Sequence, residues 1–248
     1  YSIPFQLLTC IVLQPGTSLT HDVLRLCAAH GTGIVAVGEG GVRYFASSPF
    51  GPNESARARR QALLWANQAD RLTVARRMYA WRLGEVFPSA DIAVLRGMEG
   101  SRMKETYKRL ANQFQVPWAG RRYDRDKPEA TDLSNQAINH TVTAVEATAM
   151  VAVAVTGAVP QLGFIHEDAG HAFTLDVTDL FRDTVTLPVA FTAARQAAQR
   201  PGEPVERIAR RLAAKTLREN KIVLRMIDRI KEMLDSDGGE FSADGDRT

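Results

Sequence analysis

The sequence predicts an α+β protein in which a small β-rich domain precedes a large all-α domain. Apolar, β-branched runs separated by glycine fill the first 46 residues. A segment rich in serine, proline and glycine interrupts the chain at 47–53, and beyond it apolar residues recur at helical spacing. We therefore expect domains at 1–48 and 49–234, followed by a tail at 235–248 with the composition of disorder.

Composition excludes several classes of protein. The chain has 248 residues, of which 45% are hydrophobic and 24% charged, as in ordinary soluble globular proteins. Cys10 and Cys27 lack a CxxC spacing, which argues against a zinc site or a disulfide framework and favours a reduced, cytoplasmic setting. The start lacks signal-peptide features. The most apolar run, 147–159, falls short of the ~20 residues that span a bilayer, so we expect a buried core helix and no membrane contact.

Within the N-terminal part, strands are predicted at 5–13 and 33–37. A short helix capped by Thr20 is expected between them. The GEGG stretch at 38–41 indicates a turn into a further strand at 42–45. It does not match GxGxxG and no Walker lysine follows, so we interpret it as turn chemistry.

The helix expected at 52–83 is rich in arginine and aromatic residues. Any single arginine there is best explained as part of a solvated, paired face. As a set without lysine, these side chains suit phosphate recognition. The arginines are Arg57, Arg59, Arg60, Arg71, Arg76, Arg77 and Arg82, interleaved with Trp65, Tyr79 and Trp81.

The helix expected at 91–113 has two glycines, Gly97 and Gly100, around Glu99. Each costs about 1 kcal/mol relative to alanine in a helix interior, so something should compensate. Close helix packing and close approach of a ligand to the backbone are both open. The loop at 116–127 carries Arg121, Arg122, Tyr123 and Arg125, which is either an exposed polar connection or a holder of single-stranded nucleic acid.

Further helices follow. Ser134 is the predicted cap of a central helix that ends near 155 and encloses Glu146, for which an internal partner is favoured over metal ligation. Helices are also expected at 188–200, 203–219 and 221–234. The last has an apolar stripe that suits a core or a subunit contact. That stripe consists of Ile222, Met226, Ile230 and Met233.

The segment 163–183 holds the best candidate ligands, His166, Asp176 and Asp179. The aspartates lie three residues apart at a predicted helix start, so they share one face, although a helix N-terminus also favours acidic residues without any metal. Carboxylates with an imidazole suit Mg²⁺ or Mn²⁺ and chemistry on phosphates. His166 and His171 are five apart, which does not fit HExxH, and no GxSxG occurs, so a zinc protease and a serine hydrolase are not indicated.

Five blocks together resemble one known family over residues 1 to about 234. They are LLTCIVLQPGTSLTHDVLRL, GEGGVRYFAS, LRGMEGSRMKETY, WAGRRYD and GFIHEDAGHAFTLDVTDLFRDT. The chain resembles CRISPR-associated protein one, the catalytic integrase subunit of CRISPR spacer acquisition, in its subtype I-E form. The blocks also begin part of the way into that family's N-terminal β-rich domain, so its first strands are expected to be missing here.

The resemblance implies a metal site and a reaction. Glu99, His166 and Asp179 match the family's ligands for Mg²⁺ or Mn²⁺, and Asp176 matches an accompanying acidic position that is catalytic, as an outer or alternative ligand. The implied activity is a metal-dependent endonuclease and integrase that joins protospacer 3′-OH ends to the CRISPR repeat by transesterification. The residues we expect to contact DNA are Arg57, Arg59, Arg60, Arg121 and Arg122.

The resemblance also implies partners. These are double-stranded and branched DNA, a second copy in a homodimer, and a small ferredoxin-like CRISPR-associated protein. Two other functions stay open on the sequence: a catalytically inactive DNA-binding scaffold of the same complex, and a metallohydrolase of small phosphoesters. A metal-dependent DNA product would separate the integrase from the scaffold, whose binding would only depend on salt.

Overall fold

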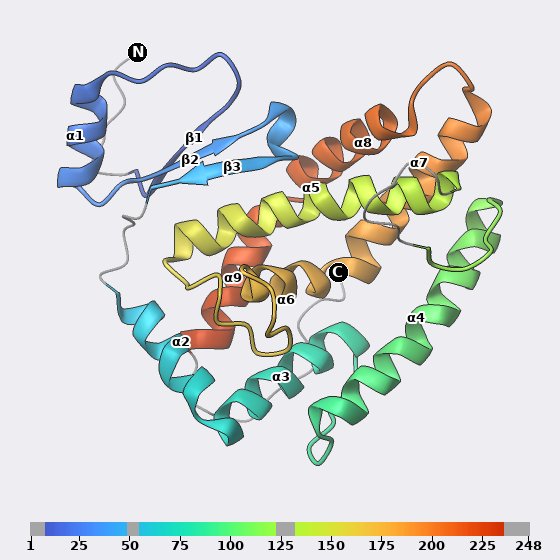
Figure 1. Ribbon diagram of the computed structural model, residues 1–248, viewed down its shortest axis with the longest axis horizontal. Coiled ribbons are helices and arrows are strands. Elements are labelled where there is room, and N and C mark those ends of the chain that lie inside the picture. The colour runs from blue at the N-terminus through green and yellow to red at the C-terminus, as the bar shows by residue number, and fades with distance from the viewer. Residues whose placement is uncertain (1–7, 49–54, 123–131, 236–248) are drawn as a thin grey trace.

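The computed structural model describes residues 8–48, 55–122 and 132–235 and shows a mostly helical protein with a small sheet near its N-terminus (Figure 1). The sheet has the order β1-β2-β3, from strands Cys10–Leu13, Gly33–Val37 and Tyr44–Ser47. β1 and β2 are parallel, so a crossover must join them, and α1 (His21–Ala29) supplies it. β3 pairs antiparallel with β2 after the short 3₁₀ turn η2 (Glu39–Gly41). The predicted short helix and its Thr20 cap are confirmed, because Thr20 accepts from the Val23 N–H.

The helical part consists of successive helices around one long central helix, α5 (Figure 1). The bounds are α2 Ala56–Ala66, α3 Gln68–Leu83, α4 Ile92–Phe114, α5 Leu133–Thr156, α6 Ala172–Leu180, η4 Arg182–Thr186, α7 Leu187–Gln199, α8 Val205–Glu219 and α9 Ile222–Asp235. The three helices predicted after Asp183 are therefore α7, α8 and α9. The predicted domain boundary at 49 lies outside the described residues.

Two local predictions are wrong. The single helix expected at 52–83 is two helices, because the side chain of Asn67 accepts the N–H groups of Ala69 and Asp70 and starts α3 anew. The cap of α5 is Asp132, whose carboxylate accepts from Asn135 N–H. Ser134 lies inside the helix and donates to the Pro117 carbonyl instead.

The core forms around α5. Its apolar residues pack against α6, α7, α8 and α9, while Val151 joins Val35 and Val37 beneath the sheet. By length and apolarity α5 resembles a membrane-spanning helix, but 56% of its most apolar stretch is buried inside the protein, as in a core helix. The stripe predicted on the last helix is confirmed as core, since Ile222, Met226 and Ile230 are fully buried and Met233 nearly so.

Candidate metal and phosphate site

A tight loop precedes α6 and carries His166. Gly163 is required there, because a Cβ at this position would overlap the His166 carbonyl oxygen and lie 2.8 Å from Ala172. Helix α6 then begins at Ala172 rather than at Asp176 as predicted. The aspartates therefore lie in the middle and last turn of the helix, and their acidity is not explained by a helix N-terminus. They keep the predicted spacing of one shared face.

Asp176 is buried and organises the loop. Its Oδ2 accepts the N–H groups of Phe164 and Ile165 at 2.6 and 3.1 Å, and its Oδ1 accepts the His166 N–H at 3.0 Å. Oδ1 also lies 2.7 Å from His166 Nδ1. Both carboxylate oxygens are thus engaged within the protein. Asp176 positions His166 and does not present a free oxygen to a ligand.

His166 is held with one ring nitrogen toward the cleft. With Nδ1 donating to Asp176, Nε2 is left as the acceptor, 3.8 Å from Asp179 Oδ2. The hydrogen bond to Asp176 raises the pKa of His166 above its ordinary value, against an opposing effect of burial. A carboxylate that orients imidazole in this way is a common support for a metal-ligating histidine.

Glu99 reaches the same cleft from α4. Its Oε2 accepts from the Tyr79 hydroxyl at 3.2 Å, and its Oε1 lies 2.7 Å from Arg82 Nη1. Burial, together with the negative charge of Glu99, raises the pKa of Tyr79 well above its ordinary value, so this hydroxyl stays a donor. Tyr79 and Arg82 lie three residues apart on α3 and therefore act from one helix face.

Asp179 has one carboxylate oxygen near Arg82 at the cleft and the other bound to Arg182 behind it. Its Oδ2 lies 3.7 Å from Arg82 Nη1, and its Oδ1 accepts from Arg182 Nη1 at 3.0 Å. Arg182 also donates to the Tyr107 hydroxyl at 3.1 Å. Tyr107 is stacked on Trp118 with ring centroids 4.8 Å apart. One oxygen of Asp179 is thereby fixed from behind, while the other faces the cleft.

These side chains line one cleft of about 540 Å³, whose walls are Tyr79, Arg96, Glu99, Ile165, His166, Glu167, Asp168, Ala169 and Asp179. Two carboxylates and an oriented imidazole are donors that suit Mg²⁺ or Mn²⁺. Within the described residues, no three His, Cys, Asp or Glu side chains already converge as a ready metal site. Arg82 lies between Glu99 and Asp179 and supplies the positive charge there. The donor set fits the cation, and Arg82 holds two of its members.

The glycines beside Glu99 do not serve helix packing. A Cβ at Gly97 or at Gly100 would meet nothing within 4 Å. The packing explanation is therefore wrong, and the close approach of a ligand remains as a prediction. Arg96, one turn before Gly100, donates to the Ile165 carbonyl and ties α4 to the His166 loop.

Most of the arginines of α2 and α3 have partners inside the protein. Arg57 donates to the Thr156 carbonyl and pairs with Asp235, so it joins α2 to α5 and α9. Four more arginines pair with a carbonyl oxygen or carboxylate elsewhere in the fold: Arg71, Arg76, Arg77 and Arg82. Of the predicted DNA contacts in α2, Arg59 is exposed and Arg60 is half-buried.

The loop arginines divide in the same way. Arg121 donates to the side-chain oxygens of Asn135 and Asn139 at 3.0 and 2.7 Å, which fixes the loop onto α5. The side chain of Arg122 is exposed, while its backbone N–H donates to Asn135 and its carbonyl oxygen accepts from Arg121. Tyr123 and Arg125 lie outside the described residues.

Residues that the sequence reasoning did not place in the site are Tyr79, Arg82, Arg96 and Arg182. Tyr79 and Arg82 belonged to the arginine and aromatic series, and their spacing of three was the available signal. Arg96 precedes Glu99 by three residues and Arg182 follows Asp179 by three, which is the same signal. Only the tertiary contacts show which of these pairs meet.

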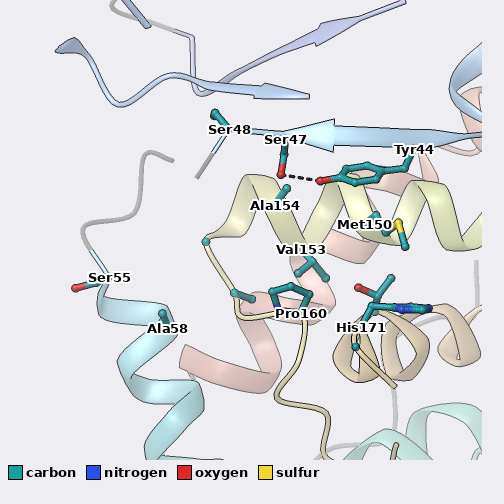
Figure 2. A pocket seen from close by; sticks show the side chains of 14 residues that line it. Tyr44, Ser47, Ser48, Ser55, Ala58, Met150, Val153, Ala154, Pro160 and His171 are labelled. Carbon is teal, nitrogen blue, oxygen red and sulfur yellow. Dashed lines mark hydrogen bonds between the residues drawn. The ribbon is translucent and has the colours of Figure 1, made fainter. Parts of the chain in front are cut away.

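A second hollow, of about 470 Å³, lies between β3 and the helices α2 and α5 (Figure 2). Figure 2 shows Tyr44 and Ser47 joined by a hydrogen bond on one side and His171 on the other. His171 Nε2 lies 2.8 Å from Glu146 Oε1, which confirms the predicted internal partner of Glu146. The remaining lining is mostly small and apolar. This hollow lacks the clustered carboxylates of the cleft.

Known proteins are similar to this chain in sequence and in fold. A family model described as CRISPR associated protein Cas1 matches residues 80–220. The CRISPR-associated endonuclease Cas1 of Escherichia coli (strain K12) is 37% identical over 234 residues, which is 94% of this chain and 75% of that relative. The CRISPR-associated endonuclease Cas1 of Geobacter sulfurreducens is 34% identical over 237 residues, 95% of this chain and 76% of that relative.

Solved structures agree. A crystal structure of a TtCas1–DNA complex has a TM-score of 0.85 and 33% identity, covering 94% of this chain and 86% of that chain. A casposase bound to an integration product has a TM-score of 0.66 at 15% identity over 92% of this chain and 83% of that chain, which shows a shared fold alone. Because the family model matches more than half of the chain, including Glu99, His166 and Asp179, and because both relatives are this similar over most of their length, the chain belongs to the Cas1 family of CRISPR-associated proteins.

Proposed function

We propose that this protein is a metal-dependent DNA endonuclease and integrase that acts in CRISPR spacer acquisition, in a subtype I-E system. The observation that carries the proposal is the meeting of Glu99, His166 and Asp179 on the walls of one cleft. They come from α4, from the loop before α6, and from α6, up to 80 positions apart in sequence by residue number. The nuclease names of the relatives and the DNA complex of TtCas1 support it.

The proposed reaction is a phosphoryl transfer between DNA ends. The 3′-hydroxyl oxygen of a protospacer attacks a phosphodiester at the edge of the repeat, and a new phosphorus–oxygen bond forms. The bond to the 3′-oxygen of the repeat strand breaks, and that oxygen leaves with a proton. One phosphodiester replaces another, so no external energy source is required. Water in place of the 3′-hydroxyl gives the endonuclease reaction.

Glu99, His166 and Asp179 would hold a Mg²⁺ or Mn²⁺ ion. When bound, such an ion supplies charge stabilisation to a phosphoryl oxygen and favours the ionised form of the attacking or leaving oxygen. The protein's own contribution is orientation: Asp176 keeps Nε2 of His166 toward the cleft, and Arg182 fixes one oxygen of Asp179. In this proposal Asp176 is a positioning residue rather than a ligand.

Substrate binding would rest on exposed cations of α2 and of the loop before α5. Arg59 and Arg122 are the predicted DNA contacts whose side chains are exposed, whereas Arg57 and Arg121 act inside the fold. Double-stranded and branched DNA are the proposed substrates. A homodimer and a small ferredoxin-like partner protein complete the proposed assembly, which would work in the cytoplasm.

The test is strand transfer into a supercoiled plasmid that carries a CRISPR repeat, with and without Mn²⁺. Asp179→Ala should abolish the joined product and leave DNA binding intact. Asp168→Ala is the matched control, because Asp168 lines the same cleft with an exposed side chain and should leave the product in place. Unchanged integration by Asp179→Ala would refute the proposal. Salt-dependent binding without any metal-dependent product from the unmodified protein would favour the inactive scaffold.

A further inference from the structure

Arg82 is a buried cation surrounded by carboxylates. It lies in the last turn of α3, and its side chain is 5% exposed. Its Nη1 lies 2.7 Å from Glu99 Oε1 and 3.7 Å from Asp179 Oδ2, while its Nε lies 3.6 Å from Asp183 Oδ2. Three carboxylates gathered around one point repel one another unless a positive charge lies between them. In this structure the guanidinium is that charge.

The three nitrogen atoms of the Arg82 guanidinium differ in their hydrogen-bond partners. Among the described residues, Arg82 Nε and Asp183 Oδ1 are buried atoms without a hydrogen-bond partner. The remaining amino group, Nη2, donates to Met103 Sδ at 3.4 Å, which is a weak acceptor. Buried polar atoms that lack partners are rare and unfavourable. Since these two belong to oppositely charged neighbours, a shift of the guanidinium toward Asp183 would let Nε donate to Oδ2 and Nη2 donate to Oδ1, and it would release Glu99.

Asp183 is placed for this exchange by the helical turn that follows α6. The π-helical turn η4 (Arg182–Thr186) contains Asp183, and such turns are frequent at functional sites. Arg182, the residue before it, already binds Asp179 and Tyr107. Glu99 keeps the Tyr79 hydroxyl as a second partner whichever way Arg82 moves. The turn therefore offers Arg82 a second anion close to the first.

We propose that Arg82 is an internal counter-cation of the cleft: it holds Glu99 and Asp179 while no divalent ion is bound, and it transfers to Asp183 when one binds. The inference rests on the metal site of the proposed function and adds two residues to it. Arg82 and Asp183 are positioning residues, because they act through the ligands. A guanidinium and a divalent cation repel each other at the same two carboxylates, so the two occupancies compete.

Competition of this kind predicts opposite changes in metal affinity for two variants. Removal of the charge of Arg82 frees Glu99 and Asp179 and should tighten metal binding. Removal of the charge of Asp183 takes away the second anion, keeps Arg82 on Glu99 and should weaken metal binding. A purely structural role of both residues predicts weaker binding in both variants, since each loss would loosen the cleft. Opposite signs therefore exclude a purely structural role, and the double variant Arg82→Gln/Asp183→Asn separates the exchange from a fixed field of two charges: in the exchange, the loss of Asp183 no longer weakens binding once Arg82 is gone, whereas two independent charges act additively.

The experiment is calorimetric titration of the full chain with Mn²⁺ alone, without DNA. Arg82→Gln keeps a hydrogen-bond donor for folding, and we expect it to bind Mn²⁺ roughly tenfold more tightly than the unmodified protein. Asp183→Asn should bind several-fold more weakly, and Arg82→Lys should stay near the unmodified protein. Arg109→Gln, on the exposed side of α4, is the control for net charge and should change nothing.

Each outcome is decisive. Tighter binding by Arg82→Gln together with weaker binding by Asp183→Asn supports the exchange. Equal or weaker binding by a folded Arg82→Gln overturns it and leaves the proposed metal site intact. Absence of Mn²⁺ binding by the unmodified protein overturns both the exchange and the metal site. If Arg82→Gln does not fold, Asp183→Asn decides, because equal or tighter binding in that variant contradicts the transfer.

Discussion

The Nδ1 atom of His166 lies 2.7 Å from Oδ1 of Asp176, and the same carboxylate accepts the backbone N–H groups that lead up to this histidine. One buried side chain therefore sets both the path of the loop and the orientation of the imidazole. A change at Asp176 should therefore alter the path of the loop and the orientation of the imidazole together. This relationship separates two aspartates that look equivalent in the sequence, Asp176 and Asp179.

Asp176→Asn should destabilise the protein. An amide presents one acceptor and one donor group, so part of the N–H cluster before α6 would face another donor. Loss of such buried hydrogen bonds costs about 1–3 kcal/mol, which urea unfolding in EDTA would measure. Asp168→Asn is the exposed control and should leave the unfolding midpoint in place. An unfolding free energy of Asp176→Asn equal to that of the control would contradict the positioning role.

The hydrogen bond between His166 and Asp176 should make the stability of the protein depend on pH. The pKa of His166 is raised above its ordinary 6.5, chiefly by Asp176. A raised pKa in the folded state means that the stabilisation from this residue is full below about pH 6.5 and is lost as pH rises through the folded pKa. In metal-free protein, His166→Gln should therefore lose more stability at pH 5.5 than at pH 8.5. NMR titration of the imidazole, with a midpoint at or below 6.5, would refute the expectation.

Alanine at three glycines near the cleft should change the stability of the protein in opposite directions. Gly97 and Gly100 lie inside α4 with open space around them, so alanine should stabilise the protein by about 0.5–1 kcal/mol at each. Gly163→Ala should destabilise it, because the new Cβ would overlap Ala172 and the His166 carbonyl. Thermal unfolding of the three variants measures this.

The same two α4 variants test whether DNA or the divalent metal ion comes close to the backbone of α4. If it does, Gly97→Ala and Gly100→Ala should be more stable yet less active in strand transfer. Full activity in both variants would show that the open space serves no ligand. Gly202→Ala, also with open space around its Cβ, is a control outside the cleft.

Two neighbouring arginines of α2 should separate DNA binding from folding. Arg59→Ala should weaken DNA binding and reduce the salt slope by about 1, with the unfolding midpoint unchanged, since its side chain is exposed. Arg57→Ala should lower the unfolding midpoint, because it removes the bonds to Thr156 and Asp235. Fluorescence anisotropy at several salt concentrations, beside thermal unfolding, tests both. Identical salt slopes for Arg59→Ala and the unmodified protein would remove Arg59 from the interface.

Much of the fold follows from local sequence. The strand at 33–37, the cap at Thr20 and the core stripe of α9 depend on short patterns that the structure preserves. The errors have equally local causes. Asn67 caps a helix within a pattern that reads as continuous, and Asp132 competes for the cap that Ser134 also suits.

The site was predictable only in part. The pattern of 163–183 shows His166, Asp176 and Asp179 as candidate ligands but cannot show which aspartate is buried. Glu99 joins them only through a family resemblance, because no spacing links residues 67 positions apart by residue number. The sequence pattern places Arg82 on a solvated helix face together with the other arginines. Its burial depends on how α3 packs against α4 and α6, which no local pattern contains.

The stacking of Tyr107 on Trp118 lies two helical turns from Glu99 along α4. Eight residues of helix form a rigid lever of about 12 Å between this anchor and the carboxylate. A tilt of roughly 5° at the aromatic anchor thus displaces Glu99 by about 1 Å, enough to change the geometry of a reaction. Because α4 lies at the margin of the helical part (Figure 1), aromatic rings outside the cleft contribute to the placing of Glu99 within it.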